Sequence, residues 1–189
     1  MTASYSAQAP AAVVMVRPHA FRSNPDTLAD NAFQKRDAAA TQADTAAAAH
    51  AEVSTMVRQL QDAGVRVHLF EDTGTATPDA VFPNNWFSTH AGGHMALYPM
   101  ATPSRQRERR WDIIDGLKQH YRVQDVIDYS GLEQDHVYLE GTGAMVLDHI
   151  DRIAYTAQSN RANPVALERF CTHFNFEPMA FATADAQGQ

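Results

Sequence analysis

Residues 137–181, VYLEGTGAMVLDHIDRIAYTAQSNRANPVALERFCTHFNFEPMAF, contain the clearest alternation of strand and helix patterns in the chain. Asn163 followed by Pro164 suits the cap and the first turn of a helix. Short apolar runs on both sides of this helix predict strands. The stretch therefore predicts a ββαβ-like unit, with strands at Val137–Glu140, Ala144–Leu147, Arg152–Thr156 and near Met179–Phe181.

A second copy of this pattern precedes the first. A helix is expected from about Ser104 to His120, because Trp111, Ile114 and Leu117 fall on one face at helical spacing. Strands flank this helix, and the first two are joined by a glycine-containing turn. The strands are expected at Asn85–His90, His94–Tyr98 and Tyr121–Asp128, with the turn at Ala91-Gly92-Gly93.

The N-terminal copy is less regular. Nine of the fourteen residues from Ala38 to Ala51 are alanine, which favours a helix. Apolar residues then recur at i, i+3, i+4 and i+7, so one helix face should be buried, and Gly64 should end the helix. The face comprises Val53, Met56, Val57 and Leu60, and strands are expected on either side at Val13–Arg17, ending at Pro18, and at Val65–Phe70.

These repeats predict an α/β fold of about three ββαβ modules. Repeats of roughly 50 to 60 residues favour a modular architecture over a doubly wound sheet. We expect a disordered tail at 1–12, one domain at 13–182 and a polar tail or cut point at 183–189. The modules within the domain are expected at about 13–72, 79–130 and 136–182.

Composition narrows the class of protein. A chain of 189 residues that is 44% hydrophobic can form one substantial core. The net charge of −7 argues against nucleic acid or an anionic membrane as partner, since both attract clustered positive charge. No apolar run approaches a membrane span, and the start has no signal-peptide pattern. A single cysteine fits a reducing compartment, so a cytoplasmic protein is expected.

Four segments carry uncommon residue combinations. Residues 78–90, PDAVFPNNWFSTH, resemble the PD-x-x-F segment of guanidino-modifying hydrolases. Residues 139–143, LEGTG, resemble an EGGD segment, and 159–163, SNRAN, resemble an S-x-R-T-N helix entry. Pro103-Ser104-Arg105 with Glu108 is similar to an arginine-bearing loop of the dimethylarginine hydrolase branch. Taken in chain order, the four segments resemble the superfamily of arginine deiminases, amidinotransferases and dimethylarginine hydrolases, most closely its arginine deiminase-related citrulline-utilisation branch.

This resemblance implies a partial pentein α/β-propeller. Pentein enzymes have five ββαβ modules around a central channel that holds the active site, and this chain would supply about three of them. Their catalytic His and nucleophilic Cys would lie beyond Gln189. The chain is therefore expected to be the N-terminal part of a Cys-dependent hydrolase or amidinotransferase for an arginine- or citrulline-like amino acid, inactive alone. The alternative is a non-catalytic pentein-fold protein that binds an amino acid or a protein partner.

The chemistry implied needs no metal and no cofactor. Carboxylates hold the guanidinium through charge-assisted hydrogen bonds, a thiolate attacks its central carbon, and an acid–base group protonates the leaving amine. By resemblance, Asp79 holds substrate and Glu140 orients the catalytic His or the substrate. Asp79 could instead form an Asx turn after Pro78. Glu140 could instead be structural, although burial of an unpaired carboxylate is unfavourable.

Four further residues complete the candidate site. Phe82, Asn84 and Asn85 belong to the PD-x-x-F segment and are assigned to substrate binding. The dimethylarginine branch carries an acidic pair where this chain has Asn84 and Asn85, and an Asp where it has Gly143. Amides attract a cation less and suit a neutral ureido group such as that of citrulline. Arg105 could bind a substrate carboxylate, or it could lie on a solvated helix face.

Other reactive side chains are given structural roles. Cys171 shares a helical stripe with Leu167, Phe170 and Phe174, so a core position and an unreactive thiol are predicted. His90 and His94 are four residues apart, but glycines and a turn separate them without the Glu of a zinc-protease helix. The other histidines, at positions 19, 50, 68, 120, 136, 149 and 173, form no ligand spacing. Exposed module edges predict self-association.

Overall fold

The structure is a computed structural model that describes residues 8–27 and 41–183. Internal contacts divide the chain into two compact units. Unit 1 contains the described residues of 8–9, 84–101 and 115–183, and unit 2 contains those of 10–27, 41–83 and 102–114. Each unit is described by itself. The predicted division into three modules remains a prediction.

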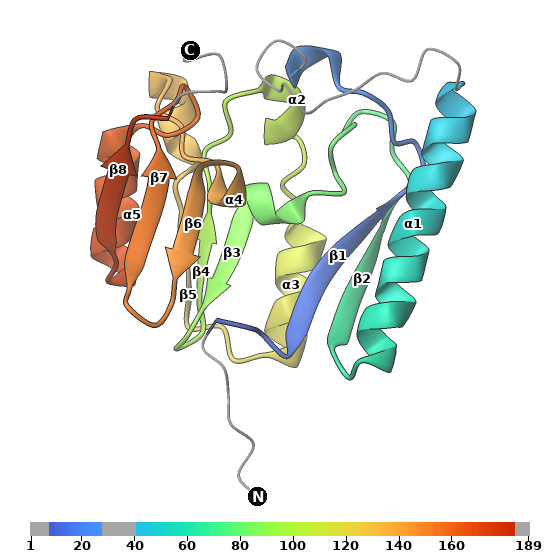
Figure 1. Cartoon of the computed structure of the whole chain (residues 1–189), viewed down its shortest axis with the longest axis horizontal. Helices are drawn as coiled ribbons and strands as arrows, with labels where there is room; N and C mark the ends of the chain where they lie inside the picture. Colours follow the sequence, from blue (N-terminus) through green and yellow to red (C-terminus); the bar gives the residue numbers. More distant parts are fainter. Residues whose placement is uncertain (1–7, 28–40, 184–189) are drawn as a thin grey trace, which may run out of the picture. The chain divides into compact units, whose positions relative to one another are not determined.

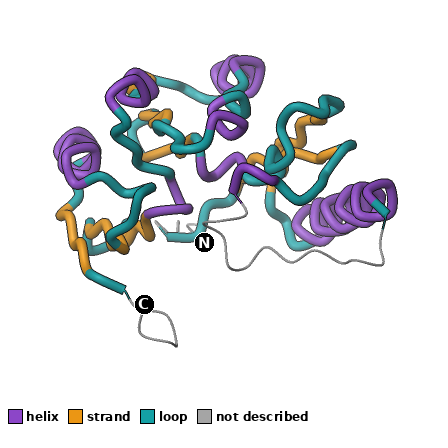
Figure 2. The backbone as a smooth tube through the Cα atoms, turned by 90° about the horizontal axis from the view of Figure 1, so that it is seen from above, coloured by secondary structure: helices purple, strands orange, loops and turns teal. Residues whose placement is uncertain are grey.

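Unit 2 is built around a β–α–β arrangement. Strands β1 (Ala12–Pro18) and β2 (Arg66–Asp72) pair in parallel, with Ala12 opposite Arg66. Helix α1 (Gln42–Asp62) connects them and runs beside both strands (Figure 1 and Figure 2). The two predicted strands and the alanine-rich helix are thus confirmed. A short 3-10 turn, η1, covers Pro25–Thr27.

The ends of α1 follow from local chemistry. Thr41 caps the first turn through a reciprocal capping box with Asp44. After the last turn, Gly64 adopts a φ of +84°, which favours glycine and ends the helix as predicted. The predicted buried face is only partly correct. Val53 and Val57 are buried, whereas Met56 lies at the margin of the stripe and is 54% exposed.

The single helix predicted from Ser104 to His120 is wrong. Two helices form instead, α2 (Pro103–Gln106) and α3 (Trp111–His120). The chain leaves the helical path where the buried side chain of Glu108 pairs with Arg105. Trp111, predicted on the buried face, begins α3 and is 56% exposed. Ile113, Ile114 and Leu117 are the buried residues of that helix.

Unit 1 contains two three-stranded sheets with the same internal order. Each is an antiparallel hairpin whose second strand pairs in parallel with a third strand that follows a helical connection. The ββαβ pattern is therefore confirmed for these two copies. The strands are β3 (Phe87–His90), β4 (His94–Leu97), β5 (Asp125–Asp128), β6 (Met145–Asp148), β7 (Ile153–Ala157) and β8 (Glu177–Phe181). The remaining elements are η2 (Pro83–Asn85), η3 (Ser130–Asp135), α4 (Gly141–Ala144) and α5 (Pro164–Phe174).

Two predicted strands differ from the structure. No strand forms at Val137–Glu140, where Leu139 makes one isolated bridge to Ala162. The segment Tyr121–Asp128 is a strand only over its last four residues, as β5. The predicted turn at 91–93 is confirmed, with positive φ angles at Gly92 and Gly93.

Helix α5 supplies much of the core of unit 1. Its buried residues Leu167, Phe170, Cys171 and Phe174 pack with Tyr98, Leu139, Met145 and Ala154 from the strands and loops. The apolar stripe predicted from the sequence is therefore confirmed. Asn163 caps the helix by accepting a hydrogen bond from the Val165 amide, also as predicted.

Some expectations fall outside the described residues. Residues 1–7 of the expected N-terminal tail, residues 38–40 of the alanine-rich segment and residues 184–189 of the expected C-terminal tail belong to this group. Within the residues that the structure does describe, none of the helices is both long enough and apolar enough to cross a membrane.

Candidate functional site

The segments LEGTG and SNRAN lie side by side in unit 1. The Glu140 amide donates a 3.1 Å hydrogen bond to the Arg161 carbonyl, and the Asn163 amide donates a 2.8 Å bond to the Tyr138 carbonyl. The two segments are therefore paired by backbone hydrogen bonds, with Leu139 and Ala162 in an isolated antiparallel bridge. This contact places the side chains of Glu140 and Arg161 next to each other.

The amide pair at 84–85 joins the same group. Asn84 Nδ2 donates to Thr142 Oγ1, which in turn donates to Asn85 Oδ1 over 3.3 Å. Gly141 is required here, because a Cβ at this position would stand 2.4 Å from the Asn84 carbonyl oxygen. The structure thus brings together three of the predicted site residues, Glu140, Asn84 and Asn85.

Glu140 is the most unusual member of this group. The residue is 1% exposed, and its Oε1 accepts a 3.2 Å hydrogen bond from the Ala101 amide. Its Oε2 has no hydrogen-bond partner among the described residues, although Arg161 Nη1 lies 3.6 Å away. A buried carboxylate oxygen without a donor is unfavourable. The arrangement can therefore accept an N–H group from a ligand or from another side chain.

The position of Gly143 limits the space around this oxygen. A Cβ at Gly143 would stand 3.1 Å from Glu140 Oε2 and 3.4 Å from Asn85 Nδ2. A side chain here would therefore press on both groups. With glycine, the carboxylate oxygen and the amide share a small polar site that carries one formal negative charge, from Glu140, and the nearby positive charge of Arg161.

Asp79 belongs to a separate polar group in unit 2. Asn24 Nδ2 donates to Asp79 Oδ2 over 2.7 Å and to Ser104 Oγ over 3.1 Å. The turn that holds Asp79 is closed by a backbone bond from the Phe82 amide to the Asp79 carbonyl. The side chain of Asp79 thus bonds to Asn24, whereas its backbone carbonyl closes the turn. Phe82 itself is 45% exposed.

Arg105 lies in the same group and is buried. Its guanidinium donates to both carboxylate oxygens of Glu108 at 2.9 to 3.1 Å, and Nε lies 3.9 Å from Asp79 Oδ2. The residue is 5% exposed, so the alternative role on a solvated helix face is wrong. Because Asp79 and Arg105 fall in unit 2 and Glu140 in unit 1, a channel shared by these groups stays a prediction.

Cys171 occupies the core position predicted for it. The residue is 2% exposed, and burial raises the pKa of its thiol to about 11. Because the thiolate is the reactive form, this cysteine is a poor nucleophile near neutral pH. His94 pairs with Asp125 at 2.7 Å, whereas His90 bonds Ser88 at 2.7 Å. The two histidines of the hairpin therefore form hydrogen bonds with different partners.

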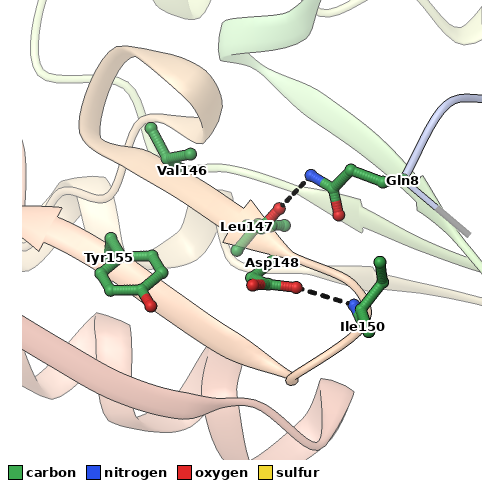
Figure 3. A pocket seen from close by; sticks show the side chains of 6 residues that line it. All are labelled: Gln8, Val146, Leu147, Asp148, Ile150 and Tyr155. Carbon is green, nitrogen blue, oxygen red and sulfur yellow. Dashed lines mark hydrogen bonds between the residues drawn. The ribbon is translucent and has the colours of Figure 1, made fainter.

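An open hollow in unit 1 involves none of the predicted site residues. Figure 3 shows its six lining residues around strands β6 and β7. Gln8 Nε2 donates to the Leu147 carbonyl, and Asp148 Oδ1 accepts from the Ile150 amide. The side chains of Gln8 and Asp148 are thus engaged with backbone groups of the hollow's own wall. The remaining lining residues are Val146 and Tyr155.

Sequence patterns missed two members of these polar groups, Asn24 and Arg161, and one contact outside them, between His19 and His50. Asn24 precedes a proline and reads only as a turn residue, yet its buried side chain contacts Asp79. Arg161 lies in the SNRAN segment, but no spacing indicates that its side chain approaches Glu140. His19 and His50 stand far apart in the sequence, and their rings meet at a centroid distance of 5.0 Å. Each contact depends on tertiary structure.

Comparison with protein families gives one match over most of the chain. Residues 17–189 match the family described as N,N dimethylarginine dimethylhydrolase, eukaryotic. Among curated protein sequences we find no match.

Solved structures share the fold at low sequence identity. A dimethylarginine dimethylaminohydrolase adduct with S-methyl-L-thiocitrulline is 17% identical, with a TM-score of 0.64 over 93% of this chain and 63% of that chain. The enzyme from Pseudomonas aeruginosa, a mutant complexed with citrulline, is 17% identical, with a TM-score of 0.63 over 92% and 62%. The substrate-bound N-terminal domain of ArgZ, an arginine dihydrolase from Cyanobacteria, is also 17% identical, with a TM-score of 0.67 over 92% and 58%.

These matches establish the fold. The α/β arrangement with three small sheets is that of pentein structures in the guanidino-modifying superfamily. The chain spans about three fifths of the length of the solved chains above.

Proposed function

The chain belongs to the family described as N,N dimethylarginine dimethylhydrolase, eukaryotic, and from this membership we propose that it forms the substrate-binding part of a hydrolase for a guanidino or ureido amino acid. The observation that supports this most is Glu140. One of its oxygens is held by the Ala101 amide, and the other is buried with no hydrogen-bond donor. A planar N–H-rich ligand would supply that donor.

The amides beside Glu140 bear on the choice of ligand. Asn84 and Asn85 are neutral, whereas the Glu140 carboxylate close to Asn85 and Gly143 carries a formal negative charge. A guanidinium would pair with this carboxylate. A neutral ureido group would use the amide oxygens and nitrogens as well. The amides therefore support the finer assignment to a citrulline-utilisation type of hydrolase.

For Asp79, Phe82 and Arg105 of unit 2, the role suggested by the motifs is substrate binding, and contacts within unit 2 bear on it. The carboxylate of Asp79 lies at a turn, and one of its oxygens accepts a hydrogen bond from Asn24. Arg105 is fixed by Glu108 in a buried two-point contact, and a guanidinium so fixed suits a substrate carboxylate. Phe82 is 45% exposed at the same turn and offers an apolar surface to an aliphatic stem.

The chemical step needs a nucleophile that this chain does not offer. The thiol of Cys171 is buried, and its pKa is raised to about 11. We therefore place the nucleophilic Cys and the catalytic His outside these 189 residues. On this proposal the isolated chain binds substrate and neither hydrolyses it nor transfers its amidino group.

Calorimetric titration of the chain with L-arginine, dimethylarginine and L-citrulline tests the proposal. We expect saturable binding of at least one ligand, and weaker binding by the Glu140→Gln variant. A hydrogen bond to a charged group contributes about 1.5–3 kcal/mol, so the variant should bind roughly 10- to 100-fold more weakly.

Glu133→Gln is the matched control. Glu133 also accepts a backbone hydrogen bond, from the Met100 amide over 2.8 Å, in the same unit. We expect this variant to bind like the original chain. No heat with any of the three ligands, or equal loss of binding in both variants, would contradict the role of Glu140.

A non-catalytic binding protein is the second candidate function, and the buried thiol of Cys171 favours it. The two candidates differ in what a protein that also carries the proposed Cys and His does with the ligands. Release of ammonia or dimethylamine from the ligands would identify the hydrolase, whereas binding without any release would identify the binding protein.

A further inference from the structure

Three side chains that can ligate a metal converge in unit 2. His19 follows strand β1, His50 lies on helix α1 and Glu71 lies on strand β2. His19 Nε2 stands 2.8 Å from Glu71 Oε2, and the two imidazole rings meet edge to face at a centroid distance of 5.0 Å. One ligand atom from each residue lies within 4.8 Å of the other two.

The β–α–β arrangement brings these residues together. In the parallel register of β1 and β2, Arg17 stands opposite Glu71 and Pro18 opposite Asp72. The His19 amide continues this pairing with a 2.9 Å bond to the Asp72 carbonyl. The site is therefore held by backbone pairing and by the packing of α1 on both strands.

The ligand set indicates the kind of cation. Imidazole nitrogens bind late first-row divalent metals such as Zn²⁺, and a carboxylate oxygen completes the three-ligand sets found at open zinc sites. The side chains of His19 and Glu71 are 42% and 39% exposed, so water can reach further coordination positions. We propose that His19, His50 and Glu71 form a surface site for one divalent late first-row cation.

Arg17 orients the carboxylate of this site. Its Nη2 donates to Glu71 Oε1 and its Nε donates to Oε2 over 3.1 Å, while Nη1 donates to Ser54 Oγ over 3.1 Å. Ligating carboxylates are commonly fixed by such outer hydrogen bonds. The guanidinium also places a positive charge near the cation, so we expect weaker binding than at a closed structural zinc site.

This site is independent of the proposed substrate site. It uses none of Asp79, Phe82, Asn84, Asn85, Arg105 or Glu140. In the described part of the chain it is the one group of three or more His, Cys, Asp or Glu side chains with this spacing. A cation here would bridge two strands and a helix, which should stabilise unit 2 against unfolding.

Titration of the whole chain with Zn²⁺, in competition with a chromogenic chelator, tests the proposal. We expect one saturable site in the original chain. Loss of a residue that only hydrogen-bonds to a metal ligand weakens metal binding by ~10- to 100-fold. The His50→Ala and Glu71→Gln variants each change a ligand itself, so they should bind Zn²⁺ more weakly by at least that factor. His50→Ala leaves the Arg17–Glu71 pair in place, and far-UV circular dichroism checks that both variants fold.

His94→Ala is the matched control. His94 forms an exposed two-residue pair with Asp125 at 2.7 Å, without a third ligand. This variant should bind Zn²⁺ as the original chain does, and Co²⁺ bound to the original chain should show visible absorption bands that His50→Ala lacks. Absence of a saturable site, or unchanged affinity in folded His50→Ala, would overturn the proposal.

Discussion

The half-buried imidazole of His90 should make unit 1 sensitive to acid. Its ring lies against Phe174, with ring centroids 4.3 Å apart, and its Nε2 bonds Ser88 Oγ at 2.7 Å. Burial lowers the pKa of His90 to about 3, and the positive charges of His149, Arg152 and His94 contribute to the same direction. The folded protein therefore holds this imidazole neutral at pH values where a free histidine is protonated.

The magnitude follows from the difference in proton binding. The unfolded chain takes up a proton at His90 below its ordinary pKa of 6.5, whereas the folded chain does so only near 3. Above pH 6.5, His90 therefore does not reduce the free energy of unfolding. As the pH falls from 6.5 toward 3, His90 reduces the free energy of unfolding progressively. Between pH 7.5 and pH 5, this single group should reduce the free energy of unfolding by about 2 kcal/mol.

Urea unfolding at pH 7.5 and pH 5, with the original chain and His90→Gln, measures this effect. Glutamine keeps an amide that can bond Ser88 and does not titrate. The original chain should lose about 2 kcal/mol more than the variant between the two pH values. The pKa of His149 is also lowered by burial, and His149 is present in both proteins, so most of its own contribution drops out of the difference. Equal losses in the two proteins would refute the reasoning.

Three further outcomes are expected. Iodoacetamide should label Cys171 slowly in the folded chain and rapidly in urea, because the thiol is buried and its pKa is about 11; equal rates would contradict this. Gly93→Ala should lower stability by more than about 2 kcal/mol, since φ is +85° and the new Cβ would stand 2.3 Å from the Arg122 carbonyl oxygen. Thermal melting of Gly131→Ala, where a Cβ meets nothing within 4 Å, provides the comparison. Asn163→Ala should lose about 1 kcal/mol in chemical denaturation by removing the cap of α5, and an unchanged midpoint would argue against the cap.

Local patterns in the sequence were sufficient for the regular elements. The alternating run at Val65–Phe70 predicted β2. Asn163 as cap and Pro164 as first helical residue predicted the start of α5, because cap chemistry acts over a few residues. The stripe of Leu167, Phe170, Cys171 and Phe174 identified the buried face of α5. These predictions depend only on residues close in the sequence and on the knowledge that one face of an element is buried.

Where tertiary contacts decide the conformation, the same patterns were insufficient. The helix break after Gln106 depends on the burial of Arg105 against Glu108, which helix propensity does not contain. The apolar segment Val137–Glu140 forms no strand and makes one isolated antiparallel bridge, from Leu139 to Ala162 of the SNRAN segment. For the candidate site, the motifs predicted one site formed by Asp79, Phe82, Asn84, Asn85, Arg105 and Glu140. The structure brings Glu140 together with Asn84 and Asn85 in unit 1, and the single site stays a prediction. The positions of Arg161 and Asn24 beside these groups became apparent only from the tertiary structure.

The central claim is that Glu140 Oε2, which accepts no hydrogen bond from the described residues, receives the N–H groups of a substrate. A crystal structure of the chain with L-arginine or L-citrulline tests it most directly. We predict a guanidino or ureido nitrogen within hydrogen-bonding distance of Glu140 Oε2, close to Asn85. A ligand bound elsewhere, with Glu140 Oε2 paired to Arg161 alone, would contradict the account.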